Sequence, residues 1–200
     1  MKDPRTYVIN LGECVKVEGL KQCQIFNDLS EGELRELASQ ATPVVFTKGT
    51  FIFDEGDPPD FFYVVYEGLV QLFKTSSSGK NVTFTISARG DTLTASALFL
   101  DRYFVSTRAM TDVTLLRIGR KDWLAFVGRH SGVAIRIIAL MAQRLNREYE
   151  RMTDIVGEEV ELRLVHSLCI LAGKFGTTLS LTRQELANFS GTTPRRRSGY

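Results

Sequence analysis

The feature that most constrains this chain is a series of short, strand-forming segments over residues 44–117, separated by regularly spaced glycines. The segments are rich in Val, Phe, Tyr and Thr, side chains that suit a pleated and half-buried surface. The glycines follow one another at intervals of seven to twelve residues, at Gly49, Gly56, Gly68, Gly79 and Gly90. Short strands at this spacing predict a β-sandwich or barrel. A set of unrelated hairpins is the alternative.

Helices are predicted on both sides of this region. Before it, Ser30 and Glu33 form a Ser-x-x-Glu capping box in front of an apolar helical pattern that ends before Pro43. After it, residues 131–156 contain no proline and only one glycine, Gly132, which predicts one long helix. Ile135 and Ile137 place further apolar side chains on its first turns.

One set of positions on the long helix recurs at alternating intervals of four and three residues, as in a coiled-coil interface. We call this set the seam of the long helix; it consists of Ala134, Ile138, Met141, Leu145, Glu148, Met152 and Ile155. The pattern predicts a homodimer formed along this helix. A helix that packs only against its own domain is the alternative.

Glu148 is the polar member of this set. In a parallel dimer it would face its symmetry mate, and two close carboxylates repel each other unless they are paired. Arg144 and Arg151 are four residues before it and three after it, within reach on one helix face. We hypothesise that this group biases the rotation of the paired helices. A solvated charge cluster is the alternative.

The C-terminal part predicts two more helices and the beginning of a third. Residues 158–174 form a helical pattern whose expected buried side holds Leu162, Val165, Leu168, Cys169 and Ala172. Thr182 and Glu185 then form a second capping box, before a short helix that buries Leu186, Ala187 and Phe189. Ser190-Gly191 predicts a turn, and Thr193-Pro194 the start of another helix. Helix, glycine-containing turn and helix is a DNA-reading motif, with an ordinary helical hairpin as the alternative.

Composition excludes several classes of protein. With 44% hydrophobic and 24% charged residues, the chain is neither disordered nor a coiled-coil rod. It has no apolar run of membrane-spanning length and no apolar segment typical of a signal peptide, so a cytoplasmic protein without membrane contact is expected. Three cysteines, an odd number, fit a reducing compartment. The net charge of +2 is too small to indicate nucleic-acid binding by itself.

Seven short segments carry a family resemblance, and they lie at residues 25–30, 48–49, 55–57, 62–70, 89–91, 141–145 and 181–187. They resemble the CRP/FNR family of bacterial transcription regulators over residues 25–194. The resemblance implies an α+β fold. A double-stranded β-helix, or jelly roll, like a cyclic-nucleotide-binding domain would be followed by a dimerisation helix and an incomplete, winged-helix-like helix–turn–helix. We expect a tail over residues 1–24, an effector-sensing β-roll over 25–130, the dimerisation helix over 131–156 and a truncated DNA-binding domain over 157–200.

The region where the resemblance places an effector departs from the family pattern. Cyclic-nucleotide binders have Gly-Glu where this chain has Thr94-Ala95, and Arg-Ser where a shorter loop here reads Arg102-Tyr103-Phe104. The Thr-Ser pair that contacts adenine is replaced by Glu148-Tyr149. We therefore do not expect cAMP as the effector. The candidate effector-binding residues are Asp91, Thr94, Ala95, Arg102, Tyr103, Phe104, Glu148 and Tyr149.

Other effector chemistries were considered on the same residues. An apolar pocket for a hydrophobic effector is one hypothesis, lined by Phe61, Phe62, Phe84, Tyr103 and Phe104, and ordinary core and surface aromatics are the alternative. An iron–sulfur cluster needs four ligands, and Cys14, Cys23 and Cys169 are too few. A redox-responsive Cys14–Cys23 pair stays open. His130 at the start of the long helix is expected to be structural, so neither haem nor a metal site is predicted.

The DNA-contacting residues implied by the resemblance are Thr182, Arg183, Gln184, Thr192, Thr193, Arg195, Arg196 and Arg197. Family members continue after Thr-Pro with a recognition helix and a wing, whereas this chain continues with Arg195-Arg196-Arg197 and stops at Tyr200. Arginines there would contact phosphates, which carry little sequence information. We expect family function for the full-length protein and poor sequence-specific binding by the chain as it stands.

The function expected from the sequence is that of a homodimeric transcription regulator. Its partners would be DNA, RNA polymerase and a small-molecule or redox effector. A ligand-binding regulatory β-roll without sequence-specific DNA binding is the alternative. We do not expect an enzyme, because the sequence offers no nucleophile–base pair, metal spacing or phosphate-binding loop.

Overall fold

The computed structural model describes residues 5–192 apart from residues 78, 94, 158, 177 and 180, and it describes no side chains for residues 151 and 153–157. Along the chain lie β1 (Thr6–Val8), α1 (Glu13–Lys21), the 3-10 helix η1 (Gln24–Phe26), α2 (Glu31–Gln40), β2 (Thr42–Phe46), β3 (Phe51–Phe53), β4 (Phe61–Glu67), β5 (Val70–Thr75), β6 (Asn81–Ser87), β7 (Thr92–Leu93), η2 (Ala95–Phe99), β8 (Ser106–Ala109), β9 (Val113–Gly119), α3 (Arg120–Arg129), α4 (Ser131–Gly157), α5 (Val160–Phe175) and α6 (Arg183–Ser190).

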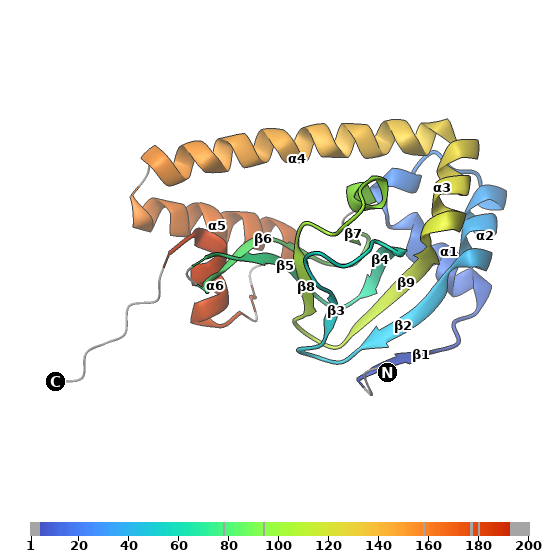
Figure 1. Cartoon of the computed structure of the whole chain (residues 1–200), viewed down its shortest axis with the longest axis horizontal. Coiled ribbons are helices and arrows are strands. Elements are labelled where there is room, and N and C mark those ends of the chain that lie inside the picture. Colours follow the sequence, from blue (N-terminus) through green and yellow to red (C-terminus); the bar gives the residue numbers. More distant parts are fainter. Residues whose placement is uncertain are drawn as a thin grey trace. The chain divides into compact units, whose positions relative to one another are not determined.

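The strands form the predicted β-sandwich. One sheet has the order β1-β2-β9-β4-β7 and the other β3-β8-β5-β6. The long pairing of β4 with β9 is antiparallel and matches Phe62 with Ile118 and Val64 with Leu116. Helices α1 and α3 pack against β4, as Figure 1 shows. The strand-forming pattern and the glycine spacing therefore identified this part of the fold correctly.

The five regularly spaced glycines have a backbone geometry typical of tight turns. All five have positive φ, a backbone conformation that residues other than glycine rarely adopt. Gly68 also has no room for a side chain, because a Cβ there would lie 2.4 Å from the carbonyl oxygen of Asp112. A substitution at Gly68 would therefore strain the turn between β4 and β5.

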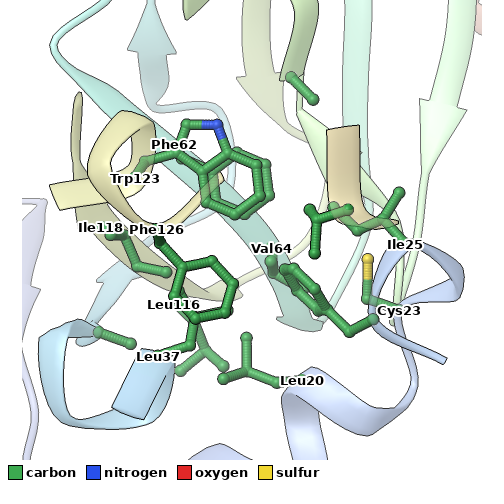
Figure 2. Packing of buried hydrophobic residues seen from close by; sticks show 14 of the residues in the cluster. Leu20, Cys23, Ile25, Leu37, Phe62, Val64, Leu116, Ile118, Trp123 and Phe126 are labelled. Carbon is green, nitrogen blue, oxygen red and sulfur yellow. The ribbon is translucent and has the colours of Figure 1, made fainter. Parts of the chain in front are cut away.

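The larger hydrophobic core lies between the five-stranded sheet and helices α1, α2 and α3. The Trp123 indole stacks on the Phe62 ring, with centroids 3.7 Å apart and planes 3° from parallel. The Phe26 ring meets both of them edge-on. Figure 2 shows the Trp123 and Phe62 rings above Leu20, Leu37 and other aliphatic side chains of the same cluster. Strands, helices and the segment before α2 are thus joined by one core.

The expected N-terminal tail over residues 1–24 was wrong. This segment adds strand β1 to the sheet and contributes helix α1, whose Val17 and Leu20 enter the core. Gly19 lies within α1 and weakens the helical pattern of the sequence, because glycine disfavours helix interiors. Glycine is needed there because a Cβ would lie 2.6 Å from Cδ2 of Tyr66.

The remaining helices agree with the sequence except for one face. The capping boxes at Ser30 and Thr182 are both formed, and α4 is one continuous helix. In α5 the expected buried side is wrong, because Leu162, Val165, Leu168 and Cys169 are exposed, whereas Ser167 and Leu171 are buried. The helix is apolar on more than one face, so periodicity alone could not select the buried one.

The chain divides into two compact units. The first consists of Met1–Leu72 and Ile86–Ala142, and the second of Phe73–Thr85 and Gln143–Tyr200. The first unit contains the sandwich core, and in the second α5 packs against α6.

No single helix in the described ranges is long and apolar enough to cross a membrane. The pair α3–α4 meets that length and composition only when taken together across its bend of 106°.

Candidate functional site

The candidate effector residues of the β-roll are held by the chain's own groups. The Asp91 carboxylate accepts a hydrogen bond from the Ala88 backbone N–H at 2.7 Å. Ala95 is buried at the start of η2, and Thr94 lies outside the described residues. Arg102 donates from Nη1 to the carbonyl oxygen of Gly56 at 2.8 Å. The guanidinium considered as a replacement for the family's phosphate-binding arginine is thus directed to the protein backbone.

Tyr103 is the most firmly fixed of these residues. Its ring stacks on Phe53 with centroids 3.7 Å apart, and its hydroxyl donates to the carbonyl oxygen of Phe61 at 3.0 Å. Its backbone N–H and C=O pair with Asp57 and Gly56 of the loop after β3. Burial raises the pKa of the Tyr103 phenol, and it raises the pKa of the neighbouring Tyr63 to about 12. Both phenols therefore stay neutral, and the Tyr103 hydroxyl acts as a hydrogen-bond donor.

The aromatic residues considered as an apolar effector pocket do not line one site. Phe62 belongs to the core cluster with Trp123, whereas Tyr103 belongs to a second cluster with Phe53. Phe84 and Phe104 are exposed. The pocket hypothesis is therefore wrong, and the alternative of separate core and surface aromatics is correct.

Two arginines that the sequence analysis did not select have structured roles in the β-roll. Arg120, the first residue of α3, donates to the carbonyl oxygens of Leu98 and Leu100 at 3.1 and 3.2 Å, which ties η2 to α3. Arg108 of β8 donates to Oε1 of the buried Gln71 at 2.9 Å. A charged side chain within the short strand Ser106–Ala109 was the available signal for Arg108. The partners of Arg120 are too distant in sequence to have been inferred.

The seam of the long helix, α4, is exposed in the single chain where its side chains are described. Ile138, Leu145 and Met152 expose 65%, 52% and 64% of their surface, and Met141 is also exposed. A different face of α4 packs on the core through Val133 and Ile137. Glu148 and Tyr149 are exposed, Ala134 is partly buried, and the side chains of Ile155 and Arg151 lie outside the description. One helix thus has an internal and an external apolar face.

The candidate DNA-contacting residues that are described lie around α6. Thr182 caps this helix, and Arg183 and Gln184 are exposed in its first turn. Gly191 ends it in the left-handed conformation at φ 66°, and the Thr192 hydroxyl is 3.1 Å from the Ser190 hydroxyl. Thr193, Arg195, Arg196 and Arg197 lie outside the described residues.

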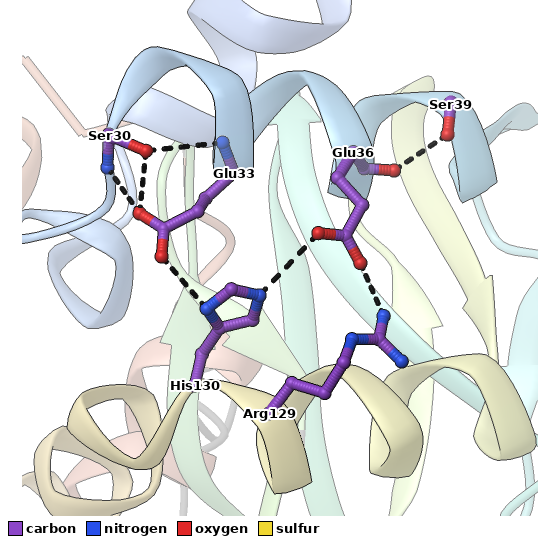
Figure 3. Close-up of polar contacts among 6 residues, drawn as sticks. All are labelled: Ser30, Glu33, Glu36, Ser39, Arg129 and His130. Atoms are coloured by element: carbon purple, nitrogen blue, oxygen red, sulfur yellow. Dashed lines mark hydrogen bonds and ion pairs between the residues drawn. The ribbon is translucent and has the colours of Figure 1, made fainter.

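A polar cluster joins α2 to the corner between α3 and α4. His130 forms this corner and contacts Glu33 and Glu36, while Arg129 pairs with Glu36 (Figure 3). Beside it lies a hollow of about 250 Å³, whose lining includes Asp28, Glu33, His130 and Arg136. None of the candidate effector residues that the structure describes lines this hollow.

The cysteines and acidic residues show no metal chemistry in the described ranges. No three His, Cys, Asp or Glu side chains there come together as ligands. Cys14 is exposed and Cys23 is buried in the core, so the two thiols have different environments.

Comparison with known proteins gives a consistent result. Residues 43–130 match the cyclic nucleotide-binding domain family. The cyclic AMP receptor protein of Thermus thermophilus is 30% identical over 86% of this chain and 81% of its own length. A CRP-like cAMP-activated global transcriptional regulator of Mycobacterium tuberculosis is 25% identical over 87% and 82%. Among solved structures, the c-di-GMP responsive global regulator CLP of Xanthomonas campestris superposes with a TM-score of 0.70 at 20% identity, covering 82% of this chain and 86% of CLP.

Proposed function

This chain belongs to the CRP/FNR family of transcription regulators, and from that premise we propose that it acts as a homodimeric, DNA-binding regulator in the cytoplasm. Its β-roll would sense an effector, and α4 would carry the response towards the DNA-binding helices. RNA polymerase would be a further partner at the promoter.

The exposed seam of the long helix is the observation that carries this proposal. Monomeric proteins rarely leave a continuous apolar stripe in water, and such stripes mark interaction sites. Alternating spacings of four and three residues suit a second α-helix of the same kind. A second copy of this chain supplies that helix, so the seam supports a dimer formed along α4.

The DNA-binding part of the proposal rests on α6 and its surroundings. Arg183 and Gln184 project from the first turn of α6, where they can contact phosphates or base edges. In the sequence, Arg195, Arg196 and Arg197 follow the turn at Gly191. These arginines would add phosphate contacts that strengthen binding without selecting a sequence.

The proposed effector is a small molecule or a redox signal other than cAMP. Ala95 has no side-chain acceptor for a ribose hydroxyl, and Arg102 and Tyr103 are engaged with Gly56 and Phe61. The relatives from Mycobacterium and Thermus are named as a cAMP-activated regulator and a cyclic AMP receptor protein. The contacts within this β-roll favour a different chemistry.

A charged residue in the seam tests the dimer. Leu145→Asp should convert the protein to a monomer in analytical ultracentrifugation, because the carboxylate would be buried between the helices. Arg147→Asp introduces the same group on another face of α4 and should leave the dimer intact. A wild-type monomer, or a dimer that survives Leu145→Asp, would overturn the proposed assembly.

A salt-titrated DNA-binding assay tests the function itself. Binding to duplex DNA should weaken steeply as salt rises, since counterion release drives phosphate contacts. No binding at low salt would favour the alternative of a regulatory β-roll that does not act on DNA.

A further inference from the structure

Opposite charges face each other where α2 meets the start of α4. The acidic side chains come from α2 and the turn before it, and the basic ones from the end of α3 and the first turns of α4. We call this set the corner cluster; it consists of Asp28, Glu33, Glu36, Arg129, His130 and Arg136. All six residues belong to the first compact unit.

Glu33 links the capping of α2 to the corner. Its Oε2 accepts hydrogen bonds from the backbone N–H and the hydroxyl of Ser30, both at 2.7 Å, which completes the capping box. Its Oε1 lies 2.9 Å from Nδ1 of His130. The Ser30 hydrogen bonds, together with the nearby His130, hold the pKa of the Glu33 carboxyl below its ordinary value. The ionised carboxylate thus connects two elements, as Figure 3 shows.

Glu36 makes the second connection, one helical turn further along α2. One of its carboxylate oxygens accepts a hydrogen bond from Nη2 of Arg129, and the other lies 3.5 Å from Nε2 of His130. His130 therefore has a carboxylate beside each ring nitrogen, and its side chain is only 16% exposed. The centroid of its ring also lies 4.3 Å from the centroid of the Phe126 ring, so the corner packs against a residue of the core.

Arg136 makes the third connection from within α4. Its Nε donates to Oδ2 of Asp28 at 2.7 Å, and Nη2 binds the same oxygen. This contact lies on the second turn of α4, beyond the corner itself. The cluster therefore holds both the bend and the first two turns of the long helix against α2.

The corner cluster lies at the bend between α3 and α4, where its contacts can affect the angle between the two helices. Helices α3 and α4 meet at 106°, and His130 is the one residue between them. The hollow of about 250 Å³ lies directly beside these contacts, so the polar side of the corner is not close-packed. Val133 and Ile137 of α4 are buried in the core, and Val133 also lines the hollow. A small change in the polar contacts could therefore pivot α4 about its apolar side.

We propose that the corner cluster is the conformational latch that fixes the direction in which α4 leaves the β-roll. Formed, it holds α4 at one angle to α2; broken, it lets the first turns of α4 move into the adjacent hollow. The functional meaning of this movement rests on the proposed function, in which α4 carries the response. The latch itself is a property of a single chain.

Charge reversal tests the latch in the full chain by hydrogen exchange. Glu36→Arg should speed amide exchange over residues 129–137 by about three- to tenfold, because an attractive contact becomes a repulsive one. The double variant Glu36→Arg/Arg129→Glu should restore slow exchange. Glu31→Arg is the matched control, since Glu31 pairs with Arg35 on the exposed face of α2 and not with the corner cluster.

The direction of α4 is measured separately by spin labels on Cys14 of α1 and on Asn146→Cys of α4, in a Cys169→Ser background. The distance distribution should broaden in Glu36→Arg and narrow again in the double variant. Unchanged exchange and distances in Glu36→Arg, or equal effects in Glu31→Arg, would overturn the latch. Both measurements are independent of DNA binding, and spin dilution with unlabelled chain removes distances between copies. A negative result for the latch therefore does not affect the proposed regulatory function, and a failure to bind DNA does not affect the proposed latch.

Discussion

The β-roll and the C-terminal helices differ in how far they bury their apolar side chains. In the β-roll, Phe62 and Trp123 are fully buried by elements of the same chain. In α4 and α5, apolar residues such as Leu145, Met152, Val165 and Ile170 are exposed. The difference indicates that the β-roll has a self-sufficient core, whereas the helices provide surfaces for other elements. Stability and assembly should therefore respond to different substitutions.

Trp123→Ala should have the largest effect on stability. It removes the ring stacked on Phe62 and leaves a cavity in the main core, which typically costs about 3–5 kcal/mol of unfolding free energy. Urea denaturation followed by circular dichroism measures this loss. Because the core lies within one chain, the loss should not depend on protein concentration. A strongly concentration-dependent loss would contradict the self-sufficient β-roll.

The two capping boxes allow the same substitution in each region. Ser30→Ala and Thr182→Ala each remove a side-chain acceptor for a helix N-terminus, at a typical cost of about 1 kcal/mol. In Ser30→Ala the loss should appear in the main unfolding transition, since α2 is part of the core. In Thr182→Ala it should appear as faster amide exchange in α6, with the main transition unchanged. Equal shifts of the main transition would show that the two regions unfold together.

Local signals made both capping boxes and the β-roll predictable from sequence. A Ser-x-x-Glu or Thr-x-x-Glu pattern acts over one helical turn, and a turn glycine such as Gly68 reflects the geometry of its own residue. Helix α1 was missed because Gly19 disfavours a helix locally but accommodates Tyr66, a residue far away in the sequence. That reason exists only in the folded chain.

The candidate site was less predictable for the same physical reason. Arg102 and Tyr103 were selected by position, but their partners Gly56 and Phe61 are more than forty residues away. The corner cluster joins residues about a hundred positions apart, and His130 could only be described as structural before its two carboxylate neighbours were known. The buried face of α5 could not be selected, because hydrophobicity alone does not say which surface a neighbour covers.

Tyr103→Phe should have a smaller effect than loss of the core tryptophan. The substitution keeps the stacking on Phe53 but removes the hydrogen bond to the Phe61 carbonyl, at a cost of about 0.5–1.5 kcal/mol. Tyr149→Phe on α4 is the matched control, since that side chain is exposed and the same atom is removed. Urea denaturation should separate the two variants. An equal effect of both would mean that the Tyr103 hydroxyl adds nothing to the β-roll.

Acid should produce the smallest effect, and it should begin at the corner cluster. The Ser30 hydrogen bonds lower the pKa of Glu33, and the Arg129 hydrogen bond lowers the pKa of Glu36, both from an ordinary value of 4.5. A lowered pKa in the folded state means that these carboxylates stabilise the protein above pH 4.5, and that this contribution is lost as pH falls through the folded pKa values. The urea midpoint should therefore be insensitive to these two groups between pH 7 and pH 5 and fall below about pH 4.5.

Glu36→Gln locates this acid sensitivity. The variant cannot gain a proton at position 36, so its urea midpoint should fall less between pH 5 and pH 3 than that of the wild type. Glu31→Gln provides the comparison outside the corner, because Arg35 also lowers the pKa of Glu31. After correction for intrinsic exchange, amide protection over residues 129–137 should depend less on pH in Glu36→Gln, where only Glu33 still titrates, and should keep its full dependence in Glu31→Gln. If both variants kept it, acid would weaken the β-roll elsewhere, and the corner would not be its most charge-dependent contact.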